Sequence, residues 1–92
     1  MSEAITVSAL NQHIKHLMDV DQILTNVLVR GEVSNYKTYP SGHHYFSLKD
    51  PEGSIRCVMF RREAMQLRFR PENGMSVIVG GRVTVFPRDG QY

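Results

Sequence analysis

Tryptophan is absent from this chain of 92 residues, and cysteine occurs once, as Cys57. A single cysteine leaves no partner for an internal disulfide bond. The sequence has no run near the roughly 18 consecutive apolar residues that a membrane-spanning helix requires. The N-terminal residues lack the basic segment followed by an apolar stretch that marks a secretory signal. Together these absences favour a cytoplasmic protein without a membrane partner.

The charge is modest overall and unevenly distributed. The formal net charge is +2, yet residues 51–92 contain seven arginines against four acidic residues, whereas residues 1–50 contain four basic and five acidic residues. Arginine binds phosphates with two parallel hydrogen bonds and stacks on bases. A local basic patch attracts polyanions even when the whole domain is close to neutral. For any one of these arginines, an ordinary solvated surface is the alternative interpretation.

Residues 6–20 have the spacing of an amphipathic helix. Thr6 or Ser8 can cap its first turn, and apolar residues recur at intervals of three and four. These apolar residues are Val7, Leu10, Ile14, Leu17 and Met18. His13 and His16 have a spacing that could hold a metal ion, but no third ligand is in register. We therefore expect surface histidines and no metal site.

Strands and turns are expected after this helix, with proline and glycine marking the breaks. In chain order they are strand 27–36, loop 37–42, strand 43–50, turn 50–53, a strand through Ile55, Cys57 and Met59, a short helix 61–67, turn 70–74, strand 75–86, hairpin turn 87–90 and the first two residues of a further strand, 91–92.

The segment 43–50 alternates between two kinds of side chain. One side carries His43, Tyr45, Ser47 and Lys49, and the other carries His44, Phe46 and Leu48. An apolar side belongs against a core, so the pattern predicts a half-buried strand. The opposite side offers a ring on which a base can stack and a cation for phosphate, which is the chemistry of a single-stranded nucleic-acid site. An ordinary solvated strand face is the alternative.

The next strand extends both sides. Arg56 and Val58 are expected to share the side of Tyr45, whereas Cys57 is expected to face the core. No base is positioned next to Cys57 by the sequence, so we interpret it as a small core residue and not as a nucleophile.

The order of elements predicts an all-β domain with the OB-fold, a small five-stranded Greek-key barrel preceded by an N-terminal helix. Residues 1–22 would be the helical segment that packs on the barrel, and residues 23–92 the barrel itself. Gly31 and Gly81 fall on the inner side of their strands, where glycine suits tight curvature. The fifth strand is expected to be truncated at residue 92.

A truncated fifth strand has a consequence for association. The first and third strands would keep unpaired edges, and exposed edges recruit other chains. We therefore predict a homodimer or strand exchange for this chain.

Several sequence blocks follow one another along the chain. They are Thr6-Val7-Ser8 with Leu10-Asn11, Val29-Arg30-Gly31-Glu32-Val33-Ser34-Asn35, Ser41-Gly42-His43 with Tyr45-Phe46 and Leu48-Lys49-Asp50, Met59-Phe60-Arg61, Phe69 with Pro71 and Gly74-Met75, and Val79 with Gly81-Arg82-Val83. In this order and spacing the blocks closely resemble the N-terminal domain of the bacterial exodeoxyribonuclease VII large subunit, and the resemblance covers essentially the whole chain.

The resemblance implies an OB-type domain that binds single-stranded DNA. In that family a catalytic region follows, and with copies of a small subunit the enzyme hydrolyses single-stranded DNA from either end to oligonucleotides. The family's catalytic region lies beyond Tyr92, so no catalytic residue, metal or cofactor is carried over to this fragment, and the small subunit is expected to bind outside it. The chain's own residues agree, because no acidic cluster with metal-ligand spacing and no nucleophile–base pair is visible.

The expected DNA-binding residues combine rings with cations. Tyr45 is expected to stack bases, with Tyr39 and Phe86 as further rings. The full set is Lys37 and Tyr39 in the first loop, His43, Tyr45, Lys49, Arg56 and Arg82. For His43, the alternative is a hydrogen bond that pins the loop to the strand.

Three further alternatives stay open at this point. Four more arginines either extend the DNA path or contact neighbouring domains of the parent enzyme. They are Arg61, Arg62, Arg68 and Arg70. The strand face could instead dock protein as an assembly module, and a self-sufficient nuclease is the third class.

Overall fold

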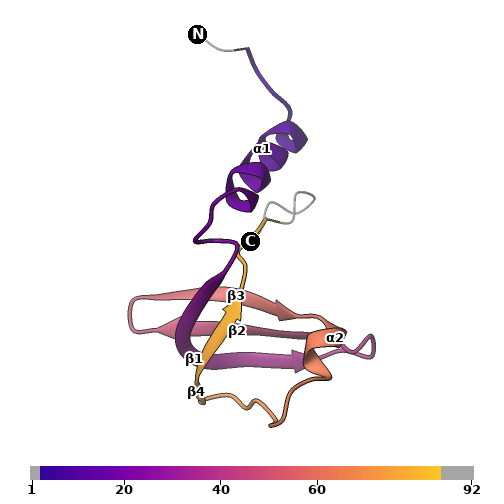
Figure 1. The fold of residues 1–92 in the computed structure, drawn as a ribbon, viewed down its shortest axis with the longest axis vertical. Coiled ribbons are helices and arrows are strands. Elements are labelled where there is room, and N and C mark those ends of the chain that lie inside the picture. Colours follow the sequence, from indigo (N-terminus) through magenta and orange to yellow (C-terminus); the bar gives the residue numbers. More distant parts are fainter. Residues whose placement is uncertain (1–2, 86–92) are drawn as a thin grey trace. The chain divides into compact units, whose positions relative to one another are not determined.

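The computed structural model describes residues 3–85 of the chain, whose elements are drawn in Figure 1. In chain order they are α1 (Val7–Asp19), β1 (Val27–Thr38), β2 (His44–Asp50), β3 (Gly53–Met59), α2 (Arg61–Ala64) and β4 (Ser76–Gly81). The chain forms two compact units, one comprising Val29–Val79 and the other Met1–Leu28 with Gly80–Tyr92.

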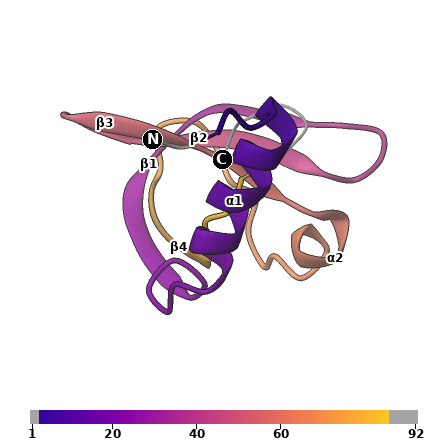
Figure 2. The same ribbon diagram turned by 90° about the horizontal axis from the view of Figure 1, so that it is seen from above.

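The unit Val29–Val79 is built on a four-stranded sheet in the order β3-β2-β1-β4. β1 pairs antiparallel with β2, and β2 pairs antiparallel with β3. β1 is long and visibly curved along its length (Figure 2). The strands were expected at these places, and the mainly β architecture with an N-terminal helix is as predicted.

The core lies on one side of this sheet. Val33, Phe46 and Leu48 are buried there, and Val33 is in register with Leu48. Partly buried side chains pack around them: Val29, Tyr36, Ile55, Cys57, Met59, Val77 and Val79. The alternation read from residues 43–50 and the inward direction of Cys57 are therefore confirmed.

Gly31 and Gly81, the two glycines expected on the inner side of the sheet, differ in the space around them. A Cβ at Gly31 would come within 3.1 Å of the Leu48 Cβ, so β1 approaches β2 too closely for a larger residue there. A Cβ at Gly81 would meet nothing within 4 Å, and Gly81 is exposed. The inward assignment is correct for Gly31 and wrong for Gly81, because β4 ends there and has no core beneath it.

A bulge interrupts the pairing of β1 with β2. The register shifts between Ser34 and Lys37, and Asn35 has a positive φ of 51°. The Tyr36 backbone N–H, which the bulge takes out of the strand pairing, donates to the Asn73 Oδ1 at 3.0 Å. The sequence placed Lys37 in the first loop, but the extra residue of the bulge lets β1 continue through Thr38, so Lys37 is a strand residue.

The turn between β2 and β3 forms where it was expected. The Asp50 Oδ1 accepts the backbone N–H of Glu52 at 2.9 Å and of Gly53 at 2.8 Å. An aspartate that bonds its own backbone in this way replaces the strand pairing that the turn lacks.

Helix α1 belongs to the other unit and begins where the sequence predicted. The Thr6 side chain accepts the Ala9 N–H at 3.0 Å as N-cap. Near its end, Lys15 and Asp19 form an ion pair at 2.5 Å, and the Thr84 hydroxyl donates to Asp19 at 3.1 Å. The hydrogen bond from Lys15 is the main reason why the pKa of Asp19 lies below its usual value.

Two details of the strand prediction are wrong. The strand expected over residues 75–86 ends at Gly81, because consecutive glycines at 80 and 81 weaken it and the Val83 N–H donates to the Leu24 carbonyl oxygen instead, at 2.7 Å. Among the described residues the third strand, β3, lies at an edge of the sheet as expected, but the other edge is β4 and not the first strand, because β1 lies between β2 and β4.

Other expectations concern residues that the structure does not describe. Phe86, the turn 87–90 and the strand beginning at residue 91 lie outside the described residues. The packing of residues 1–22 on the barrel, the truncated fifth strand and the homodimer stay predictions.

Candidate nucleic-acid interface

The side of β2 and β3 opposite the core presents polar and aromatic side chains. Tyr45 is 37% exposed, whereas its neighbour Phe46, which points to the core, is 6% exposed. Residues in register across the two strands share a side, so the pairs Tyr45–Val58, Ser47–Arg56 and Lys49–Ser54 lie together. We call this surface, comprising Tyr45, Ser47, Lys49, Ser54, Arg56 and Val58, the outer face.

Two tyrosine rings meet at one end of the outer face. Tyr39, in the loop between β1 and β2, is 47% exposed and packs edge-to-face against Tyr45, with ring centroids 5.0 Å apart. This geometry is favourable for aromatic pairs. Because both rings are partly exposed, they offer π-surface to a ligand at the same place.

The bulge in β1 brings a cation to this end. Lys37 is in register with Tyr45, so its Cα lies beside the tyrosine on the outer face. Without the extra residue, the alternation of β1 would have turned Tyr36 outward and Lys37 inward. Instead Tyr36 stacks on Phe46 in the core, with centroids 5.4 Å apart.

Lys37, Lys49 and Arg56 are exposed, and none of them forms an ion pair with another residue in the range 3–85. Glu32 of β1 is in register with Lys49, which places one carboxylate next to this cation. Because no ion pair within residues 3–85 neutralises these three cations, a negative ligand can contact them directly.

The loop that carries Tyr39 is held by hydrogen bonds within the loop and by one to α2. Within it, the Gly42 N–H donates to the Tyr39 carbonyl oxygen at 2.8 Å, and the Tyr39 N–H donates to the His43 carbonyl oxygen at 3.1 Å. The His43 Nδ1 accepts the backbone N–H of Arg61, the first residue of α2, at 2.9 Å. The loop-pinning alternative for His43 therefore describes its observed hydrogen bond, and a contact of His43 with DNA stays a prediction.

Gly42→Ala tests whether this loop geometry matters. Gly42 has a φ of +90°, and a Cβ would come within 2.8 Å of the Arg61 Cγ. We expect a loss of about 1–3 kcal/mol in the free energy of unfolding, because an L-residue is strained at this φ and the arginine must move. Thermal or urea unfolding measures the loss.

Gly53→Ala is the matched control for this substitution, since a Cβ at Gly53 meets nothing within 4 Å. Its effect should stay within about 0.5 kcal/mol. Equal losses for the two variants would contradict the tight contact at Gly42.

The family model of the OB-fold nucleic acid binding domain matches residues 5–92. The chain belongs to this family. The predicted OB-fold class is thereby confirmed, and the sheet order, the short α2 between β3 and β4, and the outer face are features of this OB domain.

The relatives of this OB domain carry one name. Exodeoxyribonuclease 7 large subunits are 52% identical over 92 residues in Ruminiclostridium cellulolyticum, 54% over 90 residues in Clostridium acetobutylicum and 54% over 93 residues in Natranaerobius thermophilus. The matches cover 100%, 98% and 100% of this chain but only 23%, 23% and 22% of those proteins. The resemblance seen in the sequence blocks is confirmed, and the chain spans less than a quarter of the length of these curated relatives.

Arg82 lies in a different compact unit from the other predicted site residues. It follows β4, in the unit that contains α1, and its charge contributes to the lowered pKa of Asp19. Five predicted residues do come together on or beside the outer face: Lys37, Tyr39, Tyr45, Lys49 and Arg56.

Phe60 was missed by the sequence reasoning. It directly follows β3, is 50% exposed, and packs edge-to-face against His43 with centroids 5.4 Å apart. The alternation through Arg56 and Val58 reaches Phe60 next, so continuing the strand pattern by one step would have found it.

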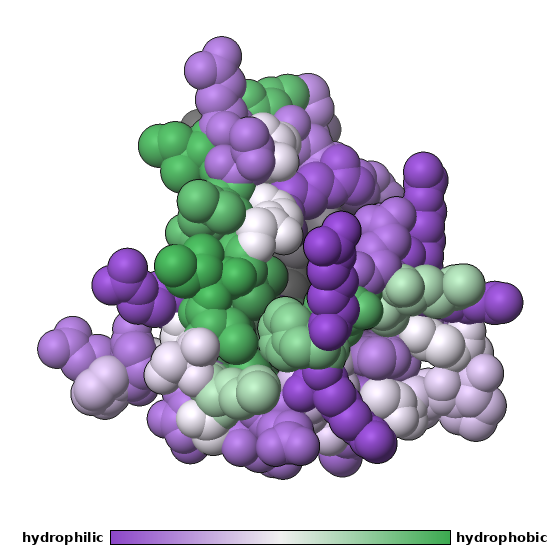
Figure 3. Space-filling view, turned by 60° about the horizontal axis from the view of Figure 1, so that its bottom comes forward, coloured by the Kyte–Doolittle hydropathy of each residue, from purple (hydrophilic) through white to green (hydrophobic). Residues whose placement is uncertain are grey.

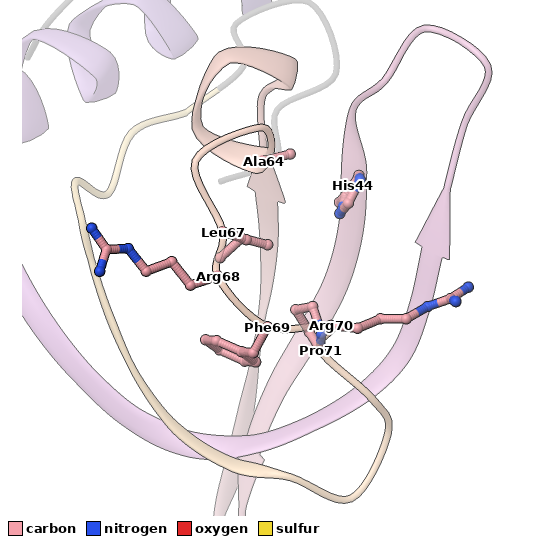
Figure 4. A pocket seen from close by; sticks show the side chains of 7 residues that line it. All are labelled: His44, Ala64, Leu67, Arg68, Phe69, Arg70 and Pro71. Atoms are coloured by element: carbon pink, nitrogen blue, oxygen red, sulfur yellow. The ribbon is translucent and has the colours of Figure 1, made fainter.

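Two cavities in the unit Val29–Val79 lie away from the outer face. One of about 390 Å³ is lined by residues of the connection between α2 and β4 together with His44 (Figure 4). The other, of about 460 Å³, shares His44, Arg70 and Pro71 with it and adds Tyr36, Thr38, Glu72 and Asn73. His44 belongs to the inner side of β2, so these cavities open at the end of the sheet where the core stops.

Metal ligation and nucleophilic attack were both considered in the sequence, and residues 3–85 bear on each. No group of three potential metal-ligating residues occurs among them. Burial raises the pKa of the Cys57 thiol, which disfavours the thiolate needed for nucleophilic attack. Within this range, no helix has both the length and the apolar character to cross a bilayer.

Apolar side chains are also exposed beyond the outer face. Figure 3 shows hydrophobic and strongly hydrophilic side chains next to one another on one surface of the molecule. In the unit Val29–Val79, the large exposed apolar residues outside the outer face are Tyr39, Phe60, Met65, Phe69, Met75 and Ile78.

Proposed function

We propose that the outer face binds single-stranded DNA. One observation supports this most strongly: the exposed Tyr39–Tyr45 ring pair shares a side of the sheet with Lys37, Lys49 and Arg56, which form no ion pair with any described residue. Membership in a nucleic-acid-binding OB family supports the same ligand class.

The chemistry of binding follows from these groups. A base stacked on an aromatic side chain contributes roughly 1–3 kcal/mol, and every base has a face to stack. Each cation that neutralises a phosphate releases counterions, so the affinity falls with salt. We expect little sequence preference, because few side chains on this surface are placed to read base edges.

We further propose that the chain is the DNA-binding part of an exodeoxyribonuclease VII large subunit, a cytoplasmic enzyme that degrades single-stranded DNA from both ends to oligonucleotides. The names of the relatives support this. In this proposal the fragment is non-catalytic and needs no cofactor, hydrolysis takes place in regions outside it, and the small subunit binds outside it as well.

The second candidate function is protein assembly. Exposed apolar side chains such as Phe60, Met65 and Ile78, together with the free edge of β3, would suit docking of another chain, including a second copy in a homodimer or by strand exchange. Light scattering at high concentration tests self-association: a dimer supports it, and a monomer at every concentration contradicts it.

Titration of a labelled single-stranded oligonucleotide at two salt concentrations separates the two functions. DNA binding predicts measurable affinity that weakens steeply at the higher salt concentration. An assembly module predicts weak binding at both concentrations. Incubation of the pure protein with labelled strands should leave them intact.

Glu32→Gln is expected to strengthen DNA binding. Glu32 lies in register with Lys49 and repels phosphate, and unit charges 4 Å apart in water interact by roughly 1 kcal/mol. We therefore expect the affinity to rise about two- to fivefold at low salt and the gain to disappear at high salt. Glu3→Gln removes the same charge in the other unit and should change nothing. Equal effects of both variants would show that only net charge matters.

A further inference from the structure

We infer that the groove between β2 and the α2–β4 connection is a second DNA subsite, which binds a nucleotide of the same single strand beyond the outer face. The inference rests on the proposed function. Its ligand class is a nucleotide with its phosphate, and the groove consists of the two cavities that share His44, Arg70 and Pro71.

The size and lining of the groove suit such a ligand. Its two parts are open depressions with volumes of about 390 and 460 Å³, a shape that suits a nucleotide lying along the surface. Figure 4 shows Ala64, Leu67 and Pro71 on one side and the His44 ring on the other. An apolar wall opposite a ring is an environment into which a flat base can insert.

Cations flank this apolar part. Arg68 and Arg70 line the groove, both are exposed, and neither forms an ion pair among the described residues. Figure 4 shows their side chains extending to either side of the connection. Glu72 is the single acidic residue lining the groove, so its surroundings are positive overall, which favours a phosphate.

The groove is held in shape by bonds to β1. The Gly74 N–H donates to the Val33 carbonyl oxygen at 2.8 Å, and the Val33 N–H donates to the Met75 carbonyl oxygen at 2.9 Å. The Asn73 side chain accepts the Tyr36 N–H. These bonds anchor the C-terminal half of the connection, so the groove exists before a ligand binds and the ordering cost is small.

The orientation of the His44 ring is held by a hydrogen bond to a residue of β1. Its Nδ1 is hydrogen-bonded to the Tyr36 hydroxyl, which leaves Nε2 for a ligand. A tyrosine hydroxyl is protonated at neutral pH even at its ordinary pKa, and burial raises the pKa of Tyr36 further, so this hydroxyl can donate to the imidazole.

The chain segment that follows β3 also offers a path for a DNA strand from the outer face to the groove. It starts at Phe60, at the end of the outer face, and continues through Arg61 and Arg62 of α2 to Arg68 and Arg70 at the groove. A strand that leaves the Tyr45 end of the outer face can follow these cations. In this proposal the arginines extend the DNA path, and contacts with other domains are the alternative that the test must exclude.

A length series of oligothymidylates tests the second subsite. Short strands occupy only the outer face, so Arg70→Gln should not change their affinity. Strands long enough to span both sites should bind wild type more tightly than short ones, and Arg70→Gln should remove about tenfold of that gain, because linked sites act at a high effective concentration. Lys15→Gln, which removes one charge from α1, is the control.

His44→Leu provides a second variant that leaves the charge of the arginines intact. It should lower the affinity for long strands alone. Equal affinities of Arg70→Gln, His44→Leu and wild type for long strands would overturn the second subsite while leaving the outer face intact. An absence of binding to strands of any length would overturn the proposed function and the second subsite together.

Discussion

Phe46→Ala should strongly destabilise the fold, whereas Tyr45→Ala, one residue earlier on the same strand, should leave the fold intact and weaken DNA binding. Phe46 is one of the three buried residues of the core cluster, with Val33 and Leu48, in the described part of the sheet. Removing a buried phenylalanine costs about 3–5 kcal/mol, a large share of the roughly 5–15 kcal/mol that stabilises a small domain. Thermal unfolding followed by circular dichroism should show a lost or strongly lowered transition.

Tyr45→Ala is the matched control for that substitution and a test of the outer face. Its ring is partly exposed and contacts Tyr39, so we expect a loss below about 1 kcal/mol in stability, or a few degrees in Tm. The affinity for a single-stranded oligonucleotide should fall about tenfold, because one stacking surface is lost. If Tyr45→Ala unfolded the protein while Phe46→Ala did not, the two sides of β2 would be assigned the wrong way round.

Combined replacement of Lys49 and Arg56 by alanine should have the second large effect. Both side chains are exposed on adjacent strands of the outer face and lack ion-pair partners among residues 3–85. Each neutralised phosphate contributes about 0.7 to the slope of log affinity against log salt for a single strand. The double variant should therefore bind about tenfold or more weakly at low salt, with a slope smaller by about 1.4.

Titrations at several salt concentrations measure both quantities, and thermal unfolding should show an unchanged Tm. Lys15→Ala serves as the control, since this lysine is on α1 and is already paired with Asp19. A double variant with the affinity and salt slope of wild type would show that phosphates bind elsewhere.

The sequence predicts the strands of this fold well, because apolar and polar residues alternate along a strand that is buried on one side only. Phe46 and Leu48 alternate with Tyr45 and Lys49, and this pattern correctly predicts the two sides of β2. The same reasoning places Cys57 toward the core and Arg56 outward. The alternation within one strand was sufficient here, since the polarity of each residue indicates whether its side chain faces the core or the solvent.

The wrong predictions depend on contacts between residues that are distant in sequence, which the alternation within one strand does not show. The bulge at Asn35 changes which side Lys37 faces, and it is supported by Asn73, which is distant in sequence. The end of β4 at Gly81 reflects the bond from Val83 to Leu24. Which strands lie at the sheet edges depends on the β1–β4 pairing, a long-range contact. The groove at His44 likewise forms between distant segments.

The most direct test of the outer face is a map of photocrosslinks between the protein and a single strand that carries iodouracil along its length. Mass spectrometry of the crosslinked peptides identifies the residues in contact with bases. We predict crosslinks to Tyr45 and Tyr39, with Phe60 as a further site next to them. Crosslinks confined to α1, or an absence of crosslinks in β2, β3 and the β1–β2 loop, would contradict DNA binding at the outer face.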